Sequence, residues 1–188
     1  MIKRLLPVLL LLLATWAARA QQNRIPYTSN NTILISMEGE KGTYDFSSGK
    51  MLVRYNENTK KLECLLPLSN LLPANDSTPI AMVQEVFFAS RYPDIYLEIE
   101  APVEKINAGT RARQTINSRI FINIQGINRE MVRPVTFTPD RNMITFSSSF
   151  EIRLQDMRLI VPARYTTMLT GRILFTIHNA RWADLRSR

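Results

Sequence analysis

Strict alternation of apolar and polar side chains is the feature that most limits what this chain can fold into. It is clearest in ITFSSSFEIRL, residues 144–154, where the residues in phase with Phe146 and Phe150 are apolar or small and those between them are mostly polar. Successive side chains of a β-strand point to opposite faces, so one face of this segment is buried and the other meets water. The pattern predicts a half-buried strand.

The same period recurs along the chain and predicts about eight strands. Further candidates are residues 32–36, 50–55, 61–68, 95–101, 119–125, 134–138 and 172–178. Polar, glycine or proline residues at 47–49, 56–58, 108–109 and 139–142 are typical of chain reversals between them. Short connections favour antiparallel hairpins, so the prediction is an all-β, antiparallel domain.

One segment breaks this pattern. Residues 76–90, DSTPIAMVQEVFFAS, offer Ser77 or Thr78 as an N-cap, with Pro79 in the first turn. Apolar residues follow at spacings of three and four, which predicts a short helix. The next residues, Tyr92-Pro93-Asp94, are expected to turn the chain into the following strand.

An open sheet of this size leaves two exposed edge strands, which proteins normally cover or close. We therefore expect a closed or nearly closed barrel of about eight strands, with the short helix at one end and Phe87 and Phe88 at its mouth. A barrel of this size either fills with its own side chains or holds one small ligand. The periodicity leaves both alternatives open.

The first residues have the form of an export signal. Lys3 and Arg4 precede an apolar run, and residues 18–20, Ala-Arg-Ala, end it, which predicts cleavage after Ala20. Loss of Lys3, Arg4 and Arg19 would lower the formal charge from +8 to +5. We expect a signal peptide at 1–20, an extension at 21–31, one barrel domain at 32–181 and a basic tail at 182–188, with the protein in the periplasm or secreted.

Residues for enzyme chemistry are sparse in this sequence. His178 is the only histidine and Cys64 the only cysteine, which cannot supply a zinc site of three or four ligands. No glycine pattern that cradles phosphates occurs. Cys64 shares its phase with Leu62 and Leu66, so a buried, inert thiol is expected. We predict a protein that is not an enzyme and has no cofactor.

Arginines concentrate in the middle third of the chain and at its end. They are Arg111, Arg113, Arg119, Arg129, Arg133, Arg141, Arg181, Arg186 and Arg188. No nucleic-acid recognition motif accompanies them, so no nucleic-acid partner is expected. A solvated basic face is one interpretation, and attraction to an anionic membrane surface or a phosphate head group is the other.

Three stretches carry a family resemblance. EVFFASRYPDIYLEIEAP (85–102), INIQGINREMVRPVTF (122–137) and FEIRLQDMRLIVP (150–162) resemble, in order and spacing, segments of the YceI-like, polyisoprenoid-binding family. The likeness covers about residues 32–180. Gln125 stands where the family usually has a histidine, and the family's N-terminal "HS" signature is not apparent near Asn30 and Asn31. The resemblance implies a lipocalin-like barrel in the bacterial periplasm that holds a long apolar chain.

From this resemblance we predict a lumen that binds an isoprenoid or fatty-acyl chain for storage or transport. The residues expected to line the lumen and its rim are Phe87, Phe88, Leu97, Ile99, Ile120, Ile122, Phe146, Phe150, Ile173 and Phe175. The alternative is a non-enzymatic envelope interaction protein with a barrel filled by its own side chains. A third hypothesis, an enzyme for an apolar substrate, needs an inward polar group such as Ser148.

Overall fold

The structure is a computed structural model, and it describes residues 26–106, 112–140 and 143–183. The predicted signal peptide at 1–20, the predicted turn at 108–109 and most of the predicted tail at 182–188 lie outside the described residues. The first strand begins at Thr28, before the expected start of the domain at 32, and the last runs to Ala183.

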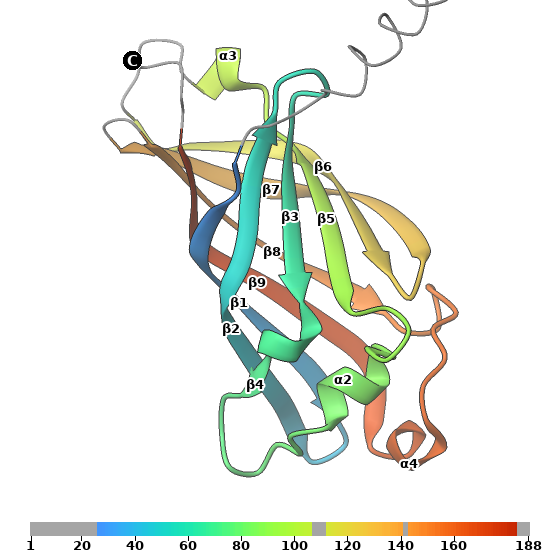
Figure 1. Ribbon diagram of the computed structural model, residues 1–188. Helices are drawn as coiled ribbons and strands as arrows, with labels where there is room; N and C mark the ends of the chain where they lie inside the picture. Colours follow the sequence, from blue (N-terminus) through green and yellow to red (C-terminus); the bar gives the residue numbers. More distant parts are fainter. Residues whose placement is uncertain (1–25, 107–111, 141–142, 184–188) are drawn as a thin grey trace, which may run out of the picture.

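Eight long antiparallel strands form a closed barrel (Figure 1), as the alternation predicts. The strands are β1 (Thr28–Gly39), β2 (Gly42–Asn56), β3 (Lys61–Pro67), β4 (Leu72–Pro73), β5 (Asp94–Glu100), β6 (Gln114–Ile124), β7 (Ile127–Asp140), β8 (Met143–Arg153) and β9 (Leu169–Ala183). Their order is β1-β9-β8-β7-β6-β5-β3-β2, and β2 pairs again with β1 to close the ring. The two-residue β4, which the sequence pattern does not predict, pairs with β2.

The helical segments are short and connect strands. They are the 3₁₀ turn η2 (Leu68–Asn70) and the helices α2 (Met82–Val86), α3 (Val103–Ile106) and α4 (Ala163–Thr166). Figure 1 places α2 and α4 together at one end of the barrel, called here the α2 end, and α3 at the opposite end. The predicted helix at one end is therefore present, and α3 and α4 are additions that strand periodicity does not indicate.

Two local predictions are wrong. The expected helix over 76–90 is confined to α2, whose N-cap is Ala81 without a side-chain hydrogen bond, rather than Ser77 or Thr78. Residues 47–49 lie inside β2, and there the β1–β2 register shifts between the pairs Asn31–Met51 and Ile33–Ser48. Glycine and serine suit an extra, unpaired residue in a strand as well as a turn, so the segment is a bulge.

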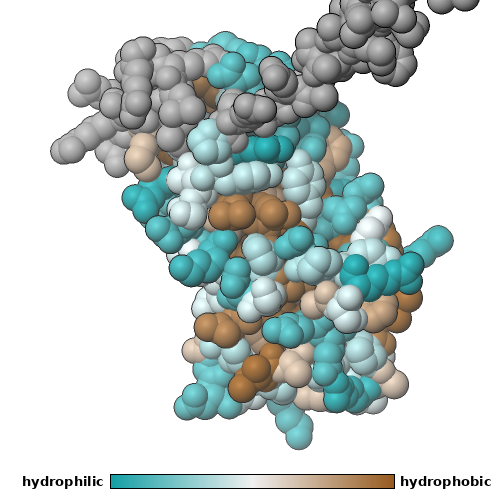
Figure 2. All heavy atoms as spheres, in the orientation of Figure 1, coloured by the Kyte–Doolittle hydropathy of each residue, from teal (hydrophilic) through white to brown (hydrophobic). Residues whose placement is uncertain are grey.

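The core of the molecule is the barrel interior. Apolar side chains from every long strand are buried there, and the inward phase of β8 from Ile144 to Ile152 is at most 6% exposed. Figure 2 shows an outer wall on which brown patches are broken up by teal and white, as alternating strands require. Among the described residues, no helix has the length and apolar character needed to cross a bilayer.

Candidate functional site: the barrel interior and its openings

The predicted lumen residues lie on the interior face of the barrel wall. Leu97, Ile99, Ile120, Ile122, Phe146, Phe150, Ile173 and Phe175 are all at most 2% exposed. Register brings them together in pairs: Leu97 of β5 faces Ile122 of β6, and Phe150 of β8 faces Phe175 of β9. The alternation in the sequence thus identifies which face of each strand is inward.

Aromatic rings close the interior at the end opposite α2. Trp182 of β9 stacks on Tyr55 of β2 with ring centroids 6.2 Å apart, and it meets the edge of Phe137 at 6.3 Å. Phe146 of β8 completes the group at 6.0 Å from the indole. The indole on β9 therefore contacts rings from three other strands, β2, β7 and β8, and links those parts of the wall across the interior. We call these four residues the Trp182 cluster.

A second aromatic group lies nearer the α2 end. Phe150 and Phe175 stack with their rings 5.3 Å apart and only 6° from parallel. Phe87, directly after α2, is fully buried and reaches Phe175 at 6.3 Å. α2 therefore sits over this end of the interior and places one phenylalanine inside it.

Phe88 takes the opposite direction from its neighbour. Its backbone has a φ of +54°, and its side chain is 37% exposed and packs edge-on against Tyr92 at 6.2 Å. It lines an outer groove of about 620 Å³ rather than the interior. Of the two phenylalanines predicted at the mouth, only Phe87 faces the barrel interior.

Small polar side chains interrupt the apolar interior. Ser148 of β8 lies between Phe146 and Phe150 on the inward phase, and its hydroxyl donates to the carbonyl of Pro134 at 3.0 Å. Ser118 of β6 is 2% exposed on the same phase as Ile120, and its Oγ has no hydrogen-bond partner. A buried hydroxyl without a partner costs free energy, which a ligand that bonds it would recover.

Gln125 joins three segments at the α2 end. Its Nε2 donates to the carbonyls of Val86 and Ile160, each at 3.0 Å, and its Oε1 accepts from the Ile160 amide at 3.0 Å. Gln125 and Gly126 both have positive φ, as a two-residue β6–β7 hairpin requires. The Gln125 side chain thus ties α2 to the loop after β8.

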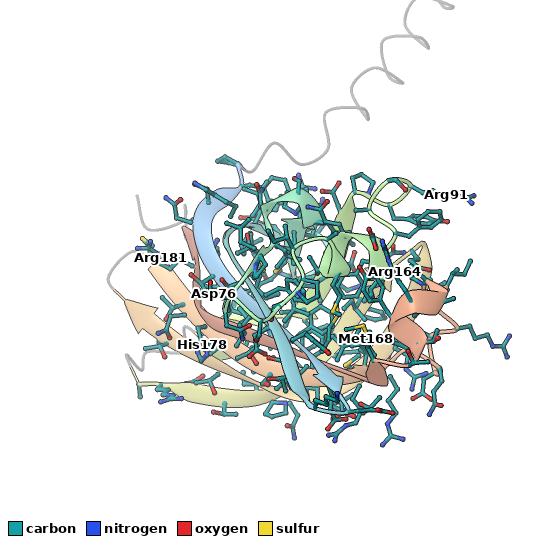
Figure 3. The ribbon with its side chains drawn as sticks, turned by 90° about the horizontal axis from the view of Figure 1, so that it is seen from below. Asp76, Arg91, Arg164, Met168, His178 and Arg181 are labelled. Carbon is teal, nitrogen blue, oxygen red and sulfur yellow. The ribbon has the colours of Figure 1, made fainter. Side chains whose placement is uncertain are left out.

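A charged contact holds α2 against α4. The carboxylate of Glu85 on α2 accepts a hydrogen bond from the Tyr165 hydroxyl at 2.7 Å and pairs with Arg164. Figure 3, which views the molecule from below, shows Arg164 at α4 on this side of the barrel, away from His178 and Arg181. The α2 end is therefore covered by two short helices that are latched to each other.

Beside this cover lie two outer hollows of similar size. One of about 620 Å³ runs between α2 and the segment before α4, and is lined by Gln84, Glu85, Phe88, Pro162 and Arg164, among others. Another of about 610 Å³ lies between the loop after β8 and the start of β9, where Leu154, Leu159 and Leu169 line it.

The barrel wall has a gap on its β7–β8 side. β7 pairs with β8 from Val135 to Asp140 and with β6 from Ile127 to Phe137, so the segment from Ile127 to Arg133 faces β8 without a ladder. Pro134 marks the break because it has no N–H to donate across the sheet. The space left, called here the β7–β8 gap, has a volume of about 430 Å³.

A satisfied polar network around Glu63 lies on the outer wall. Glu63 of β3 is 5% exposed, and its carboxylate accepts from the Arg54 guanidinium at 2.5 Å and from the Asn56 amide at 2.6 Å. Burial, together with the nearby charge of Glu63, raises the pKa of Tyr96. The Arg54 guanidinium and the Glu63 carboxylate neutralise each other, so the network stabilises the wall.

The residues considered for catalysis or metal binding are dispersed. His178 is exposed on the outer wall, and Cys64 is buried with its thiol pKa raised by that burial. Within residues 26–106, 112–140 and 143–183 no three histidine, cysteine or acidic side chains gather as a metal site would need. The predicted attraction to an anionic membrane surface stays a prediction.

No family model and no curated protein sequence matches this chain, but solved structures do. A polyisoprenoid-binding domain from Saccharophagus degradans superposes with a TM-score of 0.68 at 7% identity, over 84% of this chain and 97% of that domain. BcnA of Burkholderia cenocepacia gives 0.58 at 13% identity, over 81% and 96%. A Campylobacter jejuni YceI protein gives 0.50 at 12% identity, over 87% and 86%.

At these identities the likeness concerns the fold. It extends over most of the chain. Together with the closed eight-stranded ring, it shows that this chain has the β-barrel fold of YceI proteins and of a polyisoprenoid-binding domain.

Proposed function

We propose that the barrel binds one long apolar chain of isoprenoid or fatty-acyl type and stores or carries it unchanged. The main support is the barrel interior. Rows of apolar side chains extend there from the Trp182 cluster to the Phe87–Phe175 contact, and Ser148 lies between these two aromatic groups. Each buried CH₂ of a guest contributes about 0.8 kcal/mol, before the cost of ordering the chain. The fold shared with a polyisoprenoid-binding domain supports the same class of ligand.

A second function is favoured by the ring contacts at the two ends of the interior. Trp182 reaches three other rings, and Phe87 and Phe150 both meet Phe175, so aromatic side chains occupy much of the space. A barrel filled in this way would act through its outer wall, as a non-enzymatic envelope interaction protein. Neither function involves a reaction inside the barrel.

Native mass spectrometry of the protein purified from its own host tests the carrier. We expect a co-purified chain lipid, and uptake of added isoprenoid after delipidation. Phe146→Leu and Phe150→Leu should change uptake several-fold because their rings line the interior, whereas His178→Ala on the outer wall should not. An apo mass with no uptake by the parent protein would support the filled barrel, and sensitivity to His178 alone would point to an enzyme.

We also propose that the carrier works in the bacterial periplasm. The support is the segment at 1–20, whose charged start, apolar run and small final residues are those of a secretory signal. N-terminal sequencing of the protein released from its host by osmotic shock should begin at Gln21. Recovery only from the cytosolic fraction, with Met1 or Ile2 at the N-terminus, would contradict export.

A further inference from the structure

The β7–β8 gap leads from the outer surface toward the barrel interior. In the part of β7 that precedes Pro134, the residues on the inward face are Arg129, Met131 and Arg133. These side chains line the gap because β8 does not pair with this part of β7. On the facing side, Ile152 and Met157 line the same space and are at most 4% exposed. The gap therefore joins a charged outer rim to buried apolar side chains.

Three arginines, Arg129, Arg133 and Arg153, line this rim, and two of them pair with acidic residues of the same rim: Arg129 with Asp156 and Arg153 with Glu151. Three acidic residues also line the gap, but each lies near an arginine: Glu130 is 3.2 Å from Arg119, Glu151 is 2.6 Å from Arg172, and Asp156 is 3.8 Å from Arg129. Arg133 has no carboxylate partner among the described residues, and it donates only to the carbonyl of Val132 at 2.9 Å. Its positive charge is available to an anion.

Ser118 lies directly behind Arg133. The two residues are register partners in the β6–β7 ladder, so their side chains share the inward face with Cβ atoms about 5 Å apart. Ser118 Oγ is the buried hydroxyl without a partner. A single anionic group could thus accept a hydrogen bond from this hydroxyl while it pairs with the guanidinium, an arrangement suited to phosphate oxygens.

We propose that the β7–β8 gap binds the phosphate head group of the chain lipid held in the barrel, with Arg133 as its charge partner and Ser118 as a hydrogen-bond donor. This inference rests on the proposed carrier function and narrows its ligand to an anionic lipid. The apolar chain extends from the gap past Ile152 into the interior. The head group remains near solvent, where the exposed guanidinium meets it.

The test compares geranylgeranyl phosphate with geranylgeraniol, which share one chain and differ only in the phosphate. Binding to the delipidated mature protein is followed by Trp182 fluorescence. We expect the phosphate to bind about tenfold more tightly than the alcohol, and its affinity to fall with added salt. Arg133→Gln should remove this preference and leave binding of the alcohol unchanged.

Two variants act as controls. Arg181→Gln makes the same charge change at an exposed arginine of β9 that pairs with Thr145 and does not line the gap, and it should leave both affinities unchanged. Ser118→Ala should raise the melting temperature of the apo protein, because it removes the unpaired hydroxyl, yet weaken binding of the phosphate several-fold. A purely structural serine would not shift these two readouts in opposite directions.

The outcomes separate the two proposals. Equal affinity for both lipids, unaffected by Arg133→Gln, would overturn the head-group site while the carrier stands. Failure of both lipids to bind would overturn the carrier and with it this inference. Inorganic phosphate titrated alone distinguishes the source of the anion, and binding as tight as that of the prenyl phosphate would overturn the assignment to a lipid.

Discussion

Trp182→Ala should lower the free energy of unfolding by about 3–5 kcal/mol, the usual cost of removing a large buried aromatic side chain. The indole is 2% exposed and contacts Tyr55, Phe137 and Phe146, so its loss leaves a cavity walled by rings from three strands. Urea denaturation followed by circular dichroism measures the change. No other contact between aromatic rings in the described residues joins so many parts of the wall.

Two comparisons make this prediction specific. Trp182→Phe keeps a ring in place and should cost about half as much or less. Leu174→Ala removes a side chain that is 42% exposed on the outer wall of the same strand and should change stability by about 0.5 kcal/mol or less. A loss below about 1 kcal/mol for Trp182→Ala would mean that the neighbouring rings collapse into the space.

Gln125→Glu should destabilise the protein by an amount that grows with pH. A carboxylate at this position would face the carbonyl oxygens of Val86 and Ile160, which now accept hydrogen bonds from the Gln125 amide. Burial and these carbonyls should raise the folded-state pKa of the new carboxyl above its ordinary value of about 4.3. The loss relative to the parent is smallest below that value and increases as pH rises through the folded-state pKa.

Gln125→Leu provides the pH-independent comparison. It removes the same hydrogen bonds without adding a charge, and should cost about 2–3 kcal/mol at both pH 4 and pH 7. Urea unfolding of the parent and the two variants at these pH values tests the difference. Equal stability of Gln125→Glu and the parent at pH 7 would show that the glutamine does not hold α2 to the loop after β8.

The alternation of residues predicts the barrel wall because a strand's inward and outward faces are decided by local period alone. The segment 144–154 was predicted as a strand and is β8 almost residue for residue. The helix over 76–90 is shorter than predicted because its apolar residues do not share a face: Ile80 is 74% exposed, whereas Val83 and Phe87 are buried. Spacing gives no information on which apolar residues reach the core.

The parts of the site that depend on distant contacts were not predicted. Gln125 bonds residues 39 and 35 positions away in the chain, and nothing near it in the sequence indicates those partners. The β7–β8 gap had a partial signal, since the predicted strand 134–138 begins at Pro134, and proline is confined to places where the ladder ends or is interrupted. Ser118 and Arg133 gain their significance only from the register that places them side by side.

β9 is hydrogen-bonded to β8 on one side and to β1 on the other, although β1 lies at the opposite end of the chain. The ring therefore cannot shut until residues 169–183 have paired on both sides, and a barrel that lacks β9 has two open sheet edges. Pairing between segments this far apart in sequence makes folding slow. Until this last strand pairs, each copy exposes edges that favour aggregation, which is the kind of surface that chaperones shield.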